Sequence, residues 1–251
     1  MSFSNVKFLT GADVKPTKKL STGNINLDKI LCGGIIAKGI TEICGESGCG
    51  KTQLCLQLSL SVQFPENMGG LNGNAIYICT EEKFQSKRLN QIVKNFTHKI
   101  DKINNINFTD NIFVTYVADH LQFKNLFSKI IQLVQNKNIK LLIIDSLASL
   151  FRGNILDCEG MQKVNELRSI AKFFYKLCKD YNILVICVNQ VSQSPEINEL
   201  VPALGLAWGN LINTRIQLKK KLTSRTLEVI FSPSIPHGEI EFFINEFGVN
   251  A

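Results

Sequence analysis

Short apolar runs alternate with longer segments of helical length along most of the chain. The strand-length runs are GITEIC, AIYICT, NIFVTYV, KLLIID and ILVICVNQ. Between them lie KTQLCLQLSLSVQF, a helix beginning near Lys83, HLQFKNLFSKIIQLVQN and a helix from about Met161 to Lys179, which we interpret as amphipathic. This alternation predicts βαβ units, which build an α/β domain with a mostly parallel central sheet flanked by helices.

The pattern changes toward the C-terminus. After Gln190, the segments NTRIQLKKK, TLEVIFSP and EIEFFINEFG alternate apolar and polar residues with a period of two. That period predicts antiparallel strands that extend the sheet at its C-terminal end. Residues 1–20 are polar, contain Pro16 and a basic run from Lys15 to Lys19, and show no sustained period. We therefore predict a flexible N-terminal lead and one core domain over residues 21–251.

Composition bears on the kind of partner, on the state of the cysteines and on membrane insertion. With 28 Lys and Arg against 21 Asp and Glu, the formal charge of +7 favours a polyanionic partner such as nucleic acid, without showing where it binds. The eight cysteines form no CxxC pair and several lie in apolar runs, which favours buried reduced thiols over disulfides or a zinc site. A signal peptide and an apolar run of the ~20 residues that span a bilayer are both lacking, so membrane insertion is not expected.

A glycine-rich motif follows the first of these strands. Residues 45–52 read GESGCGKT, which matches the phosphate-binding pattern GxxxxGK[ST] between a strand and a helix. Its glycines permit a tight turn in which backbone N–H groups face a phosphate at the positive end of the helix. Lys51 is expected to reach the β- and γ-phosphates of ATP and Thr52 to ligate Mg²⁺; a glycine-rich turn with an incidental lysine is the alternative. The predicted nucleotide-binding residues are Gly45, Glu46, Ser47, Gly48, Cys49, Gly50, Lys51 and Thr52.

Polar side chains end three of the apolar runs. Asp145 closes KLLIID, so its carboxylate is expected at the ligand-binding edge of the sheet. There it is expected to be the second group, after Thr52, that supports Mg²⁺, acting through a coordinated water. Ser146 is expected to assist it. Glu81 follows AIYICT and is a candidate to orient and deprotonate the attacking water. Gln190 ends VICVNQ and is a candidate to hydrogen-bond the γ-phosphate. The alternatives are a helix cap for Asp145, a helix start with acids for Glu81 and a polar strand end for Gln190.

The order of these motifs resembles the RecA-type recombinase core rather than P-loop kinases or GTPases. The segments that carry the resemblance are STGNINLDKILCGGI, GITEICGESGCGKTQL, YICTEEKFQSKRL, KLLIIDSLASLFR and VICVNQV, and it extends over about residues 20 to 250. Within that superfamily, FPENMGGLNGNAIYICTEEKFQSKRLNQI and VPALGLAWGNLINTRIQL resemble the eukaryotic paralogues of the X-ray repair cross-complementing protein 3 family.

The resemblance implies a role for each motif and a setting for the whole chain. It implies ATP binding by residues 45–52, Mg²⁺ support from Asp145, a catalytic glutamate at Glu81 and a γ-phosphate sensor at Gln190. It also implies work in homologous recombination and double-strand break repair in the nucleus, with the cytoplasm as a second compartment. The implied partners are another recombinase paralogue, the main recombinase, and single-stranded or branched DNA. In this family a neighbouring subunit closes the ATP site, and residues 232–236, SPSIP, match the closing segment.

Three departures from the strand-exchange recombinases stand beside these matches. This chain has CTEE at residues 79–82 where they carry DTEG, and Phe231 where they carry an aspartate before the closing segment. Only about 20 residues precede the core, too few for the family's small helical N-terminal domain. The departures leave the hydrolysis rate, closure over a neighbour's nucleotide and independent duplex binding open.

Candidate DNA contacts are sparse. By the same resemblance, the segments Arg152 to Gly160 and Val191 to Gly205 face DNA, yet the first offers Arg152 and little else, and the second has no Lys or Arg. Positive charge gathers instead around a predicted hairpin turn, for which a solvated turn is the alternative. We therefore predict weak, salt-sensitive DNA binding by the isolated chain. A segment from Phe8 to Gly11 also resembles the aromatic plug that recombinase protomers insert into a neighbour. The basic residues of the turn are Lys219, Lys220, Lys221 and Arg225.

Two functional hypotheses follow, with a third of a different kind. The first is an ATP-dependent subunit that assists recombinase filament assembly and hydrolyses ATP slowly and in a DNA-dependent manner. The alternative is an autonomous, filament-forming strand-exchange ATPase; the few basic residues in both DNA-facing segments favour the first. A RecA-like ATPase outside DNA repair is the third, against which the paralogue-like segments argue.

Overall fold

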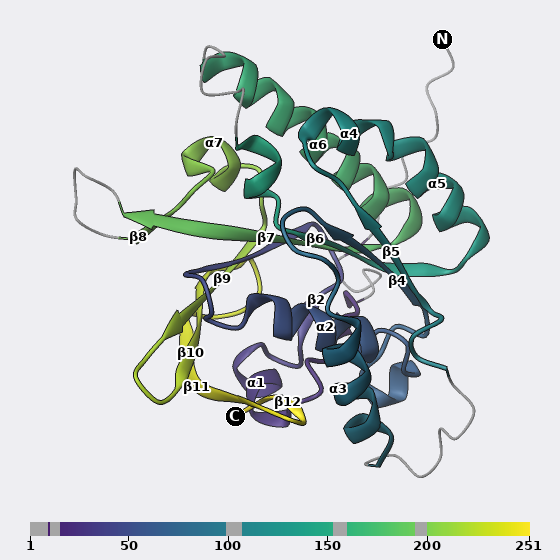
Figure 1. The fold of residues 1–251 in the computed structure, drawn as a ribbon, viewed down its shortest axis with the longest axis vertical. Coiled ribbons are helices and arrows are strands. Elements are labelled where there is room, and N and C mark those ends of the chain that lie inside the picture. Colours follow the sequence, from purple (N-terminus) through teal and green to yellow (C-terminus); the bar gives the residue numbers. More distant parts are fainter. Residues whose placement is uncertain (1–9, 11–15, 99–106, 153–159, 194–199) are drawn as a thin grey trace.

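The computed structural model describes residues 10, 16–98, 107–152, 160–193 and 200–251. A ten-stranded sheet runs through the molecule with helices on both faces (Figure 1). Its strand order is β12-β11-β10-β9-β3-β7-β6-β4-β5, and β8 pairs with β7. The predicted α/β architecture with a mostly parallel sheet is confirmed. The strands of the parallel part are β3 (Ile40–Gly45), β4 (Asn74–Cys79), β5 (Ile112–Tyr116), β6 (Ile139–Asp145) and β7 (Leu184–Gln193).

The first of the predicted C-terminal strands differs from the sequence prediction in the direction of one of its pairings. β9 (Thr214–Lys220) pairs in parallel with β3 on one side and antiparallel with β10 (Arg225–Phe231) on the other. Only from β10 onward, through β11 (Gly238–Asn245) and β12 (Gly248–Asn250), are all pairings antiparallel. A period of two reports that one face of a strand is buried, not the direction of its neighbour. The pattern of NTRIQLKKK therefore predicted the strand correctly but one of its two pairings wrongly.

The helices cover the two faces of the sheet in separate groups. One face carries α1 (Ile25–Ile30), α2 (Lys51–Ser61) and α3 (Ser86–His98), and the other carries α4 (His120–Asn125), α5 (Phe127–Asn136), α6 (Gly160–Tyr181) and α7 (Gly205–Gly209). The short 3₁₀ helices are η2 (Glu66–Met68) and η3 (Ala148–Phe151), and β8 spans Leu200–Pro202. The predicted helix from Met161 to Lys179 lies within α6, whereas α3 begins at Ser86 rather than near Lys83.

Helix α2, which begins in the glycine-rich motif, is not amphipathic. Every residue from Leu54 to Ser61 is buried. One side lies against the sheet and the opposite side is covered by α3 and by β12. Such a helix lacks the solvent-facing stripe of a surface helix, which corrects the sequence interpretation. The structure therefore holds the start of α2, and with it the motif, on a buried and fixed support.

The folded part begins before the predicted boundary at residue 21. Lys19 and Leu20 form β1, which pairs antiparallel with β2 (Ile35–Ile36) in a separate two-stranded sheet. The Leu20 side chain has no exposed surface. These two residues therefore belong to the core rather than to a flexible lead, because burying an apolar side chain stabilises the strand that carries it.

A buried glutamine joins segments from both ends of the chain to α2. The Gln57 Nε2 atom donates to the carbonyl oxygen of Thr22 at 2.6 Å and to that of Val249 at 3.2 Å. Its Oε1 atom accepts from the Val249 N–H at 2.7 Å. A buried amide is costly unless its donors and acceptor are paired, and here all of these contacts are backbone groups. Gln57 thus fixes the first and last segments of the core against the same helix.

Cysteine burial agrees with the sequence interpretation. Of the cysteines in the described residues, Cys44, Cys49, Cys55, Cys79 and Cys187 are buried, Cys178 is half-buried and Cys32 is exposed. Burial raises the pKa of the Cys44 thiol and that of the Cys79 thiol to about 12 each, because an apolar environment disfavours the thiolate. Across the described residues, we also find that every helix is too short or too polar to cross a bilayer.

Candidate active site

The glycine-rich motif forms the loop between β3 and α2. Gly50 caps the N-terminus of α2 with φ of 108°, a left-handed conformation that L-residues with a side chain rarely adopt. At Gly45, an added Cβ would lie 2.2 Å from the carbonyl oxygen of Leu218 on β9. The two glycines are therefore needed for the loop's turn and for its close contact with the neighbouring strand.

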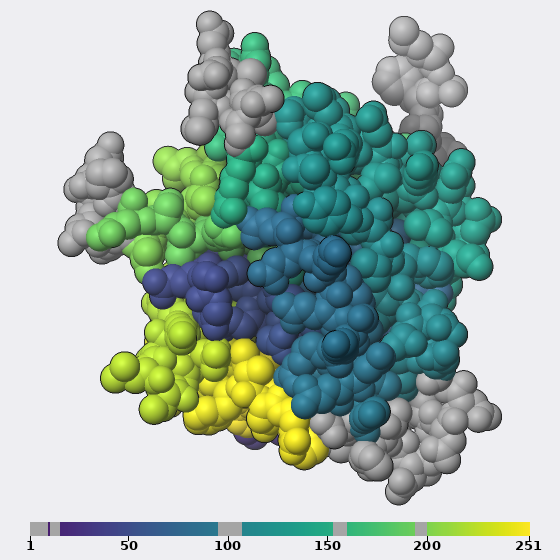
Figure 2. Space-filling model, in the orientation of Figure 1, coloured from purple at the N-terminus to yellow at the C-terminus, as the bar shows by residue number. Residues whose placement is uncertain are grey.

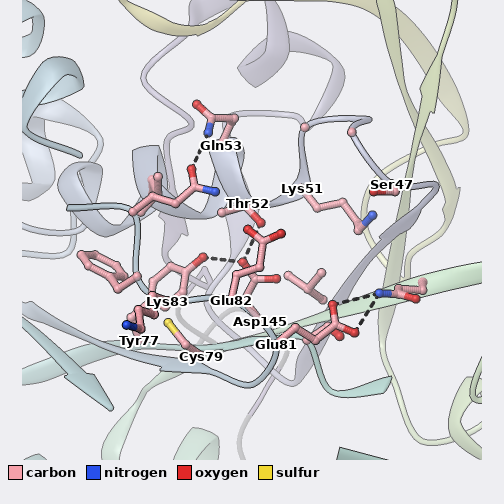
Figure 3. Close-up of a pocket in the computed structure, with 18 residues that line it drawn as sticks. Ser47, Lys51, Thr52, Gln53, Tyr77, Cys79, Glu81, Glu82, Lys83 and Asp145 are labelled. Atoms are coloured by element: carbon pink, nitrogen blue, oxygen red, sulfur yellow. Dashed lines mark hydrogen bonds between the residues drawn. The ribbon is translucent and has the colours of Figure 1, made fainter. Parts of the chain in front are cut away.

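Lys51, the first residue of α2, points back along the loop that precedes it. Its Nζ atom donates to the carbonyl oxygens of Gly45 at 2.7 Å and Glu46 at 2.6 Å. The ammonium group therefore lies beside the backbone that the sequence predicts to surround a phosphate (Figure 3). The neighbouring Cys49 side chain faces the core, and burial raises the pKa of its thiol while Lys51 opposes that effect.

A hydroxyl and a carboxylate meet next to this loop. Thr52 Oγ1 donates to Asp145 Oδ2 at 2.8 Å, across 93 positions of sequence. Asp145 is the last residue of β6, and the peptide bond that follows it is cis. The Tyr77 hydroxyl donates to the same Oδ2 atom at 2.6 Å, as the dashed line in Figure 3 shows. The arrangement brings together the hydroxyl and carboxylate oxygens that Mg²⁺ prefers.

Sequence reasoning missed Tyr77. It lies in an apolar run of β4 and is fully buried, so it was indistinguishable from a core residue. Burial, and next to it the negative Asp145, raises the pKa of the Tyr77 hydroxyl well above its ordinary value. The hydroxyl therefore stays protonated and remains a donor to Asp145. The pairing of Tyr77 with Ile143 on β6 brings it close to Asp145, and this register is invisible in the sequence.

The other side of the cleft is a cluster of three side chains. Gln190 Nε2 donates to Glu81 Oε1 at 3.1 Å and to Oε2 at 3.0 Å. Arg152 forms an ion pair with Glu81, and it also donates to the side-chain Oε1 atom of Gln190. Sequence reasoning placed Glu81 and Gln190 at the same edge, as found, but assigned Arg152 to a DNA-facing segment. In the structure, the Arg152 side chain contacts both of these cleft residues, Glu81 and Gln190.

A chain of hydrogen bonds that the sequence did not predict begins at the rim of the cleft. Gln53 of α2 donates to Gln85 Oε1 at 3.2 Å, and Arg88 of α3 donates to Gln53 Oε1 at 2.6 Å. Arg88 also donates to the carbonyl oxygen of Asn245 at 2.5 Å. In the space-filling view the C-terminal strands, in yellow, and α3, in blue, accordingly lie side by side (Figure 2). The rim therefore joins three segments that are distant in sequence.

Most of the predicted site residues line one cleft of about 350 Å³. The cleft fits a nucleoside triphosphate with Mg²⁺ in its size and in its polar groups, which are the backbone amides of a glycine loop, a lysine and a hydroxyl–carboxylate pair. Gly45, Glu46 and Cys49 form the loop without lining the cleft. The predicted residues that do line it are Ser47, Gly48, Gly50, Lys51, Thr52, Glu81, Asp145, Ser146 and Gln190.

The predicted basic turn is a hairpin whose cations are largely engaged. Lys219 pairs with Glu228 at 2.5 Å and Lys221 with Glu241 at 2.9 Å. Arg225 donates to the carbonyl oxygen of Gly48 at 3.3 Å, so it leans toward the phosphate loop. The hairpin comprises β9, β10 and the turn between them, where Arg225 lies opposite Lys220. Lys219 and Lys221 are therefore engaged by acidic residues of the neighbouring strands, whereas Arg225 contacts the phosphate loop.

Several other predicted segments can be followed only in part. Phe8, residues 153–159 and residues 194–199 lie outside the described residues. Within the predicted closing segment, Ser232 shares a hydrogen bond of 3.0 Å with Thr214, and Ile235 is buried. The segment connects β10 to β11 and is thus held against the sheet of its own chain at these two points.

Comparisons with known proteins agree with this geometry. The family model described as Rad51 matches residues 15–251. The DNA repair and recombination protein RadA of Aeropyrum pernix is 35% identical over 256 residues, which cover 98% of this chain and 78% of RadA. The DNA repair protein XRCC3 homolog of Arabidopsis thaliana is 32% identical over 291 residues, covering 93% of each chain. The resemblance stated from the motifs is therefore confirmed, and the chain belongs to the Rad51 family.

Proposed function

We propose that the chain is an ATPase that works in DNA recombination and repair. Its Rad51-family core and its similarity to a DNA repair and recombination protein, RadA, and to a DNA repair protein, XRCC3 homolog, support this role. The cleft supports the activity, since it joins a glycine loop, a lysine and a hydroxyl–carboxylate pair. The observation that carries the proposal is the hydrogen bond from Thr52 to Asp145 at 2.8 Å, directly beside Lys51. These groups would hold ATP and Mg²⁺.

Each residue of the cleft has a proposed role in hydrolysis of ATP to ADP and phosphate. The loop amides and Lys51 bind the phosphates, whereas Thr52 and Asp145 would hold Mg²⁺, with Asp145 acting through a water. When bound, Mg²⁺ neutralises negative charge on the phosphates. Glu81 accepts the proton of the attacking water, and the Gln190 amide donates to the γ-phosphate. Tyr77 keeps Asp145 oriented through its hydrogen bond of 2.6 Å.

Within this role, we propose a recombinase paralogue rather than the main recombinase. It assists filament assembly in homologous recombination, in the nucleus, together with another paralogue and the main recombinase. Hydrolysis is slow and DNA-dependent, and DNA binding by the chain alone is weak. The similarity to the XRCC3 homolog supports this assignment. So do Phe231, which replaces an aspartate, and the engagement of Lys219 and Lys221 with acidic residues.

Lys51→Ala tests nucleotide binding. Loss of a charged contact to two phosphates is expected to weaken the affinity for a fluorescent ATP analogue with Mg²⁺ about a hundredfold or more. Lys172→Ala, which removes an exposed lysine of α6, is the matched control and should keep wild-type affinity. Equal affinities of the Lys51→Ala and wild-type chains would remove the proposed ATPase.

One finding favours a second candidate, an autonomous strand-exchange ATPase. The identity with RadA, at 35%, is no lower than that with the XRCC3 homolog. Electron microscopy of the purified chain with single-stranded DNA and ATP separates the two proposals. Filaments formed by the chain alone support the second candidate. Their absence, with filament formation restored or enhanced on addition of a main recombinase, supports the first.

A further inference from the structure

Arg152 lies at the edge of the candidate site, and it is also the first residue of the segment that the resemblance predicts to face DNA. It follows η3 directly and contacts two residues of the cleft, Glu81 and Gln190. Glu81 Oε1 faces both Arg152 and Gln190, and Glu81 Oε2 accepts from Gln190 at 3.0 Å. The side-chain Oε1 atom of Gln190 accepts from Arg152. The three side chains therefore form a closed cluster in which each one contacts the other two.

A hydrogen-bond network fixes η3 next to Glu81. The Thr80 hydroxyl donates to the carbonyl oxygen of Ser146 at 2.9 Å, and it accepts from the Ser146 N–H at 2.7 Å. The Ser149 hydroxyl of η3 donates to the same carbonyl at 2.8 Å and also contacts Thr80. All three residues are buried. Thr80 precedes Glu81, and Ser149 lies three residues before Arg152. The network therefore holds the backbone at Glu81 and the backbone at Arg152 close to each other in a fixed arrangement.

The cluster occupies the groups that hydrolysis needs. Glu81 must offer a carboxylate oxygen to water, and the Gln190 amide must be directed at a phosphate. In the cluster both Glu81 oxygens accept from protein donors, and the Gln190 amide points to Glu81 instead. The Arg152 side chain is 57% exposed, against 31% for Glu81. An ion pair this exposed is weak, so another anion can displace it.

We propose that Arg152 is a positioning residue that holds Glu81 and Gln190 idle, and that the phosphodiester backbone of single-stranded DNA releases them by binding its guanidinium. The inference rests on the proposed ATPase function and adds its regulation. A planar guanidinium binds phosphate oxygens through two parallel hydrogen bonds, so a nucleic-acid phosphate is a suitable competitor for Glu81. The net charge of +7 raises the local concentration of such a polyanion.

Single-turnover ATP hydrolysis with and without oligothymidylate tests the inference on the full chain. Arg152→Ala is expected to raise the DNA-independent rate about two- to fivefold, the factor that corresponds to loss of one exposed ion pair. The same variant should lose most of the stimulation by DNA. Arg152→Lys keeps the positive charge but not the two parallel hydrogen bonds of a guanidinium. Its DNA-independent rate and its stimulation by DNA should therefore lie between those of wild type and Arg152→Ala. Arg168→Ala, at an exposed arginine of α6, is the matched control and should behave as wild type.

Affinity for a fluorescent ATP analogue, measured on the same chains, separates two kinds of failure. If the Arg152→Ala chain binds the analogue as wild type does but its DNA-independent rate is unchanged or lower, the idle hold is overturned. If Arg152→Ala and wild type are stimulated equally by DNA, or if wild type is not stimulated, the release step is overturned. If wild type does not bind the analogue, the proposed function fails and this inference fails with it.

Discussion

The two sides of the cleft are built in different ways. The phosphate side comes from eight contiguous residues, 45–52, together with Asp145, and its shape is set by backbone turns next to a buried helix. The other side, to which we assign catalysis, is the cluster of Glu81, Arg152 and Gln190, in which Gln190 is 109 positions from Glu81 and 38 from Arg152. Its members are partly exposed side chains on separate segments. Under the proposed function, this difference assigns phosphate binding to a rigid backbone loop and assigns the timing of hydrolysis to side chains that can rearrange.

The largest expected effect separates rate from affinity. Glu81→Gln should lower single-turnover hydrolysis by about 10²- to 10⁴-fold, because the amide cannot accept the proton of water. Its affinity for the ATP analogue should stay close to wild type. Thr52→Ala on the phosphate side should instead weaken Mg²⁺-dependent affinity, by about tenfold for the loss of one ligand. If both variants lower the affinity to the same extent, the proposed division into a side that binds the nucleotide and a side that serves hydrolysis would be wrong.

A smaller effect tests whether the phosphate side depends on the backbone. Gly50→Ala forces a side chain into a conformation with φ of 108° and brings its Cβ to 2.7 Å from Ile244 Cδ1. We expect a loss of about 1–3 kcal/mol in the free energy of unfolding, measured by urea titration. The control is Gly160→Ala, where a Cβ would meet no heavy atom of the described residues within 4 Å outside its own helix and chain neighbours. A Gly50→Ala chain as stable as this control would contradict the claim.

The smallest effect concerns an exposed ion pair, of the kind that Arg152 and Glu81 form in the cleft. Lys219→Ala removes a comparable pair with Glu228 on the hairpin and should lower the free energy of unfolding by about 0.2–1 kcal/mol. The hydrogen bond from Lys219 lowers the pKa of Glu228 below its ordinary value. The stabilisation is therefore complete above that ordinary value and is lost as the pH falls through the lowered pKa.

Thermal unfolding of the Lys219→Ala and wild-type chains across pH checks this expectation. The gap between their melting temperatures should be present at about neutral pH, and it should narrow as the pH falls through the lowered pKa of Glu228 and close once Glu228 is protonated in both chains. A gap that widens on acidification would contradict the assignment of the pair as the cause.

The parts that the sequence predicted are those in which neighbours in sequence are neighbours in space. The strand and helix alternation and the glycine loop are local patterns, and the carboxyl ends of parallel strands necessarily meet at one edge. The expectation that Glu81, Asp145 and Gln190 would gather there follows from that topology, and all three line the cleft. Their chemical roles remain proposals.

The parts that the sequence could not predict depend on contacts between distant segments. Glu42 is an example: it lies in an apolar run, yet it is fully buried and pairs with Arg215 while accepting from Asn189 at 2.8 Å. A buried charge of this kind is tolerated only with such partners, which come from the neighbouring strands β9 and β7. The pairing of Arg152 with Glu81 and the burial of α2 on all sides have the same origin.

The clasp that Gln57 forms between Thr22 and Val249 has a practical consequence for engineering the chain. Two backbone segments held by one amide lie close together, so a linker of a few residues could join the ends of the core. Circular permutants with new termini in an exposed connection, such as the turn between β9 and β10, would then keep the clasp intact. A tag that replaces residues 248–250 would instead deprive the buried Gln57 amide of its two contacts with Val249, at a cost of about 1–3 kcal/mol.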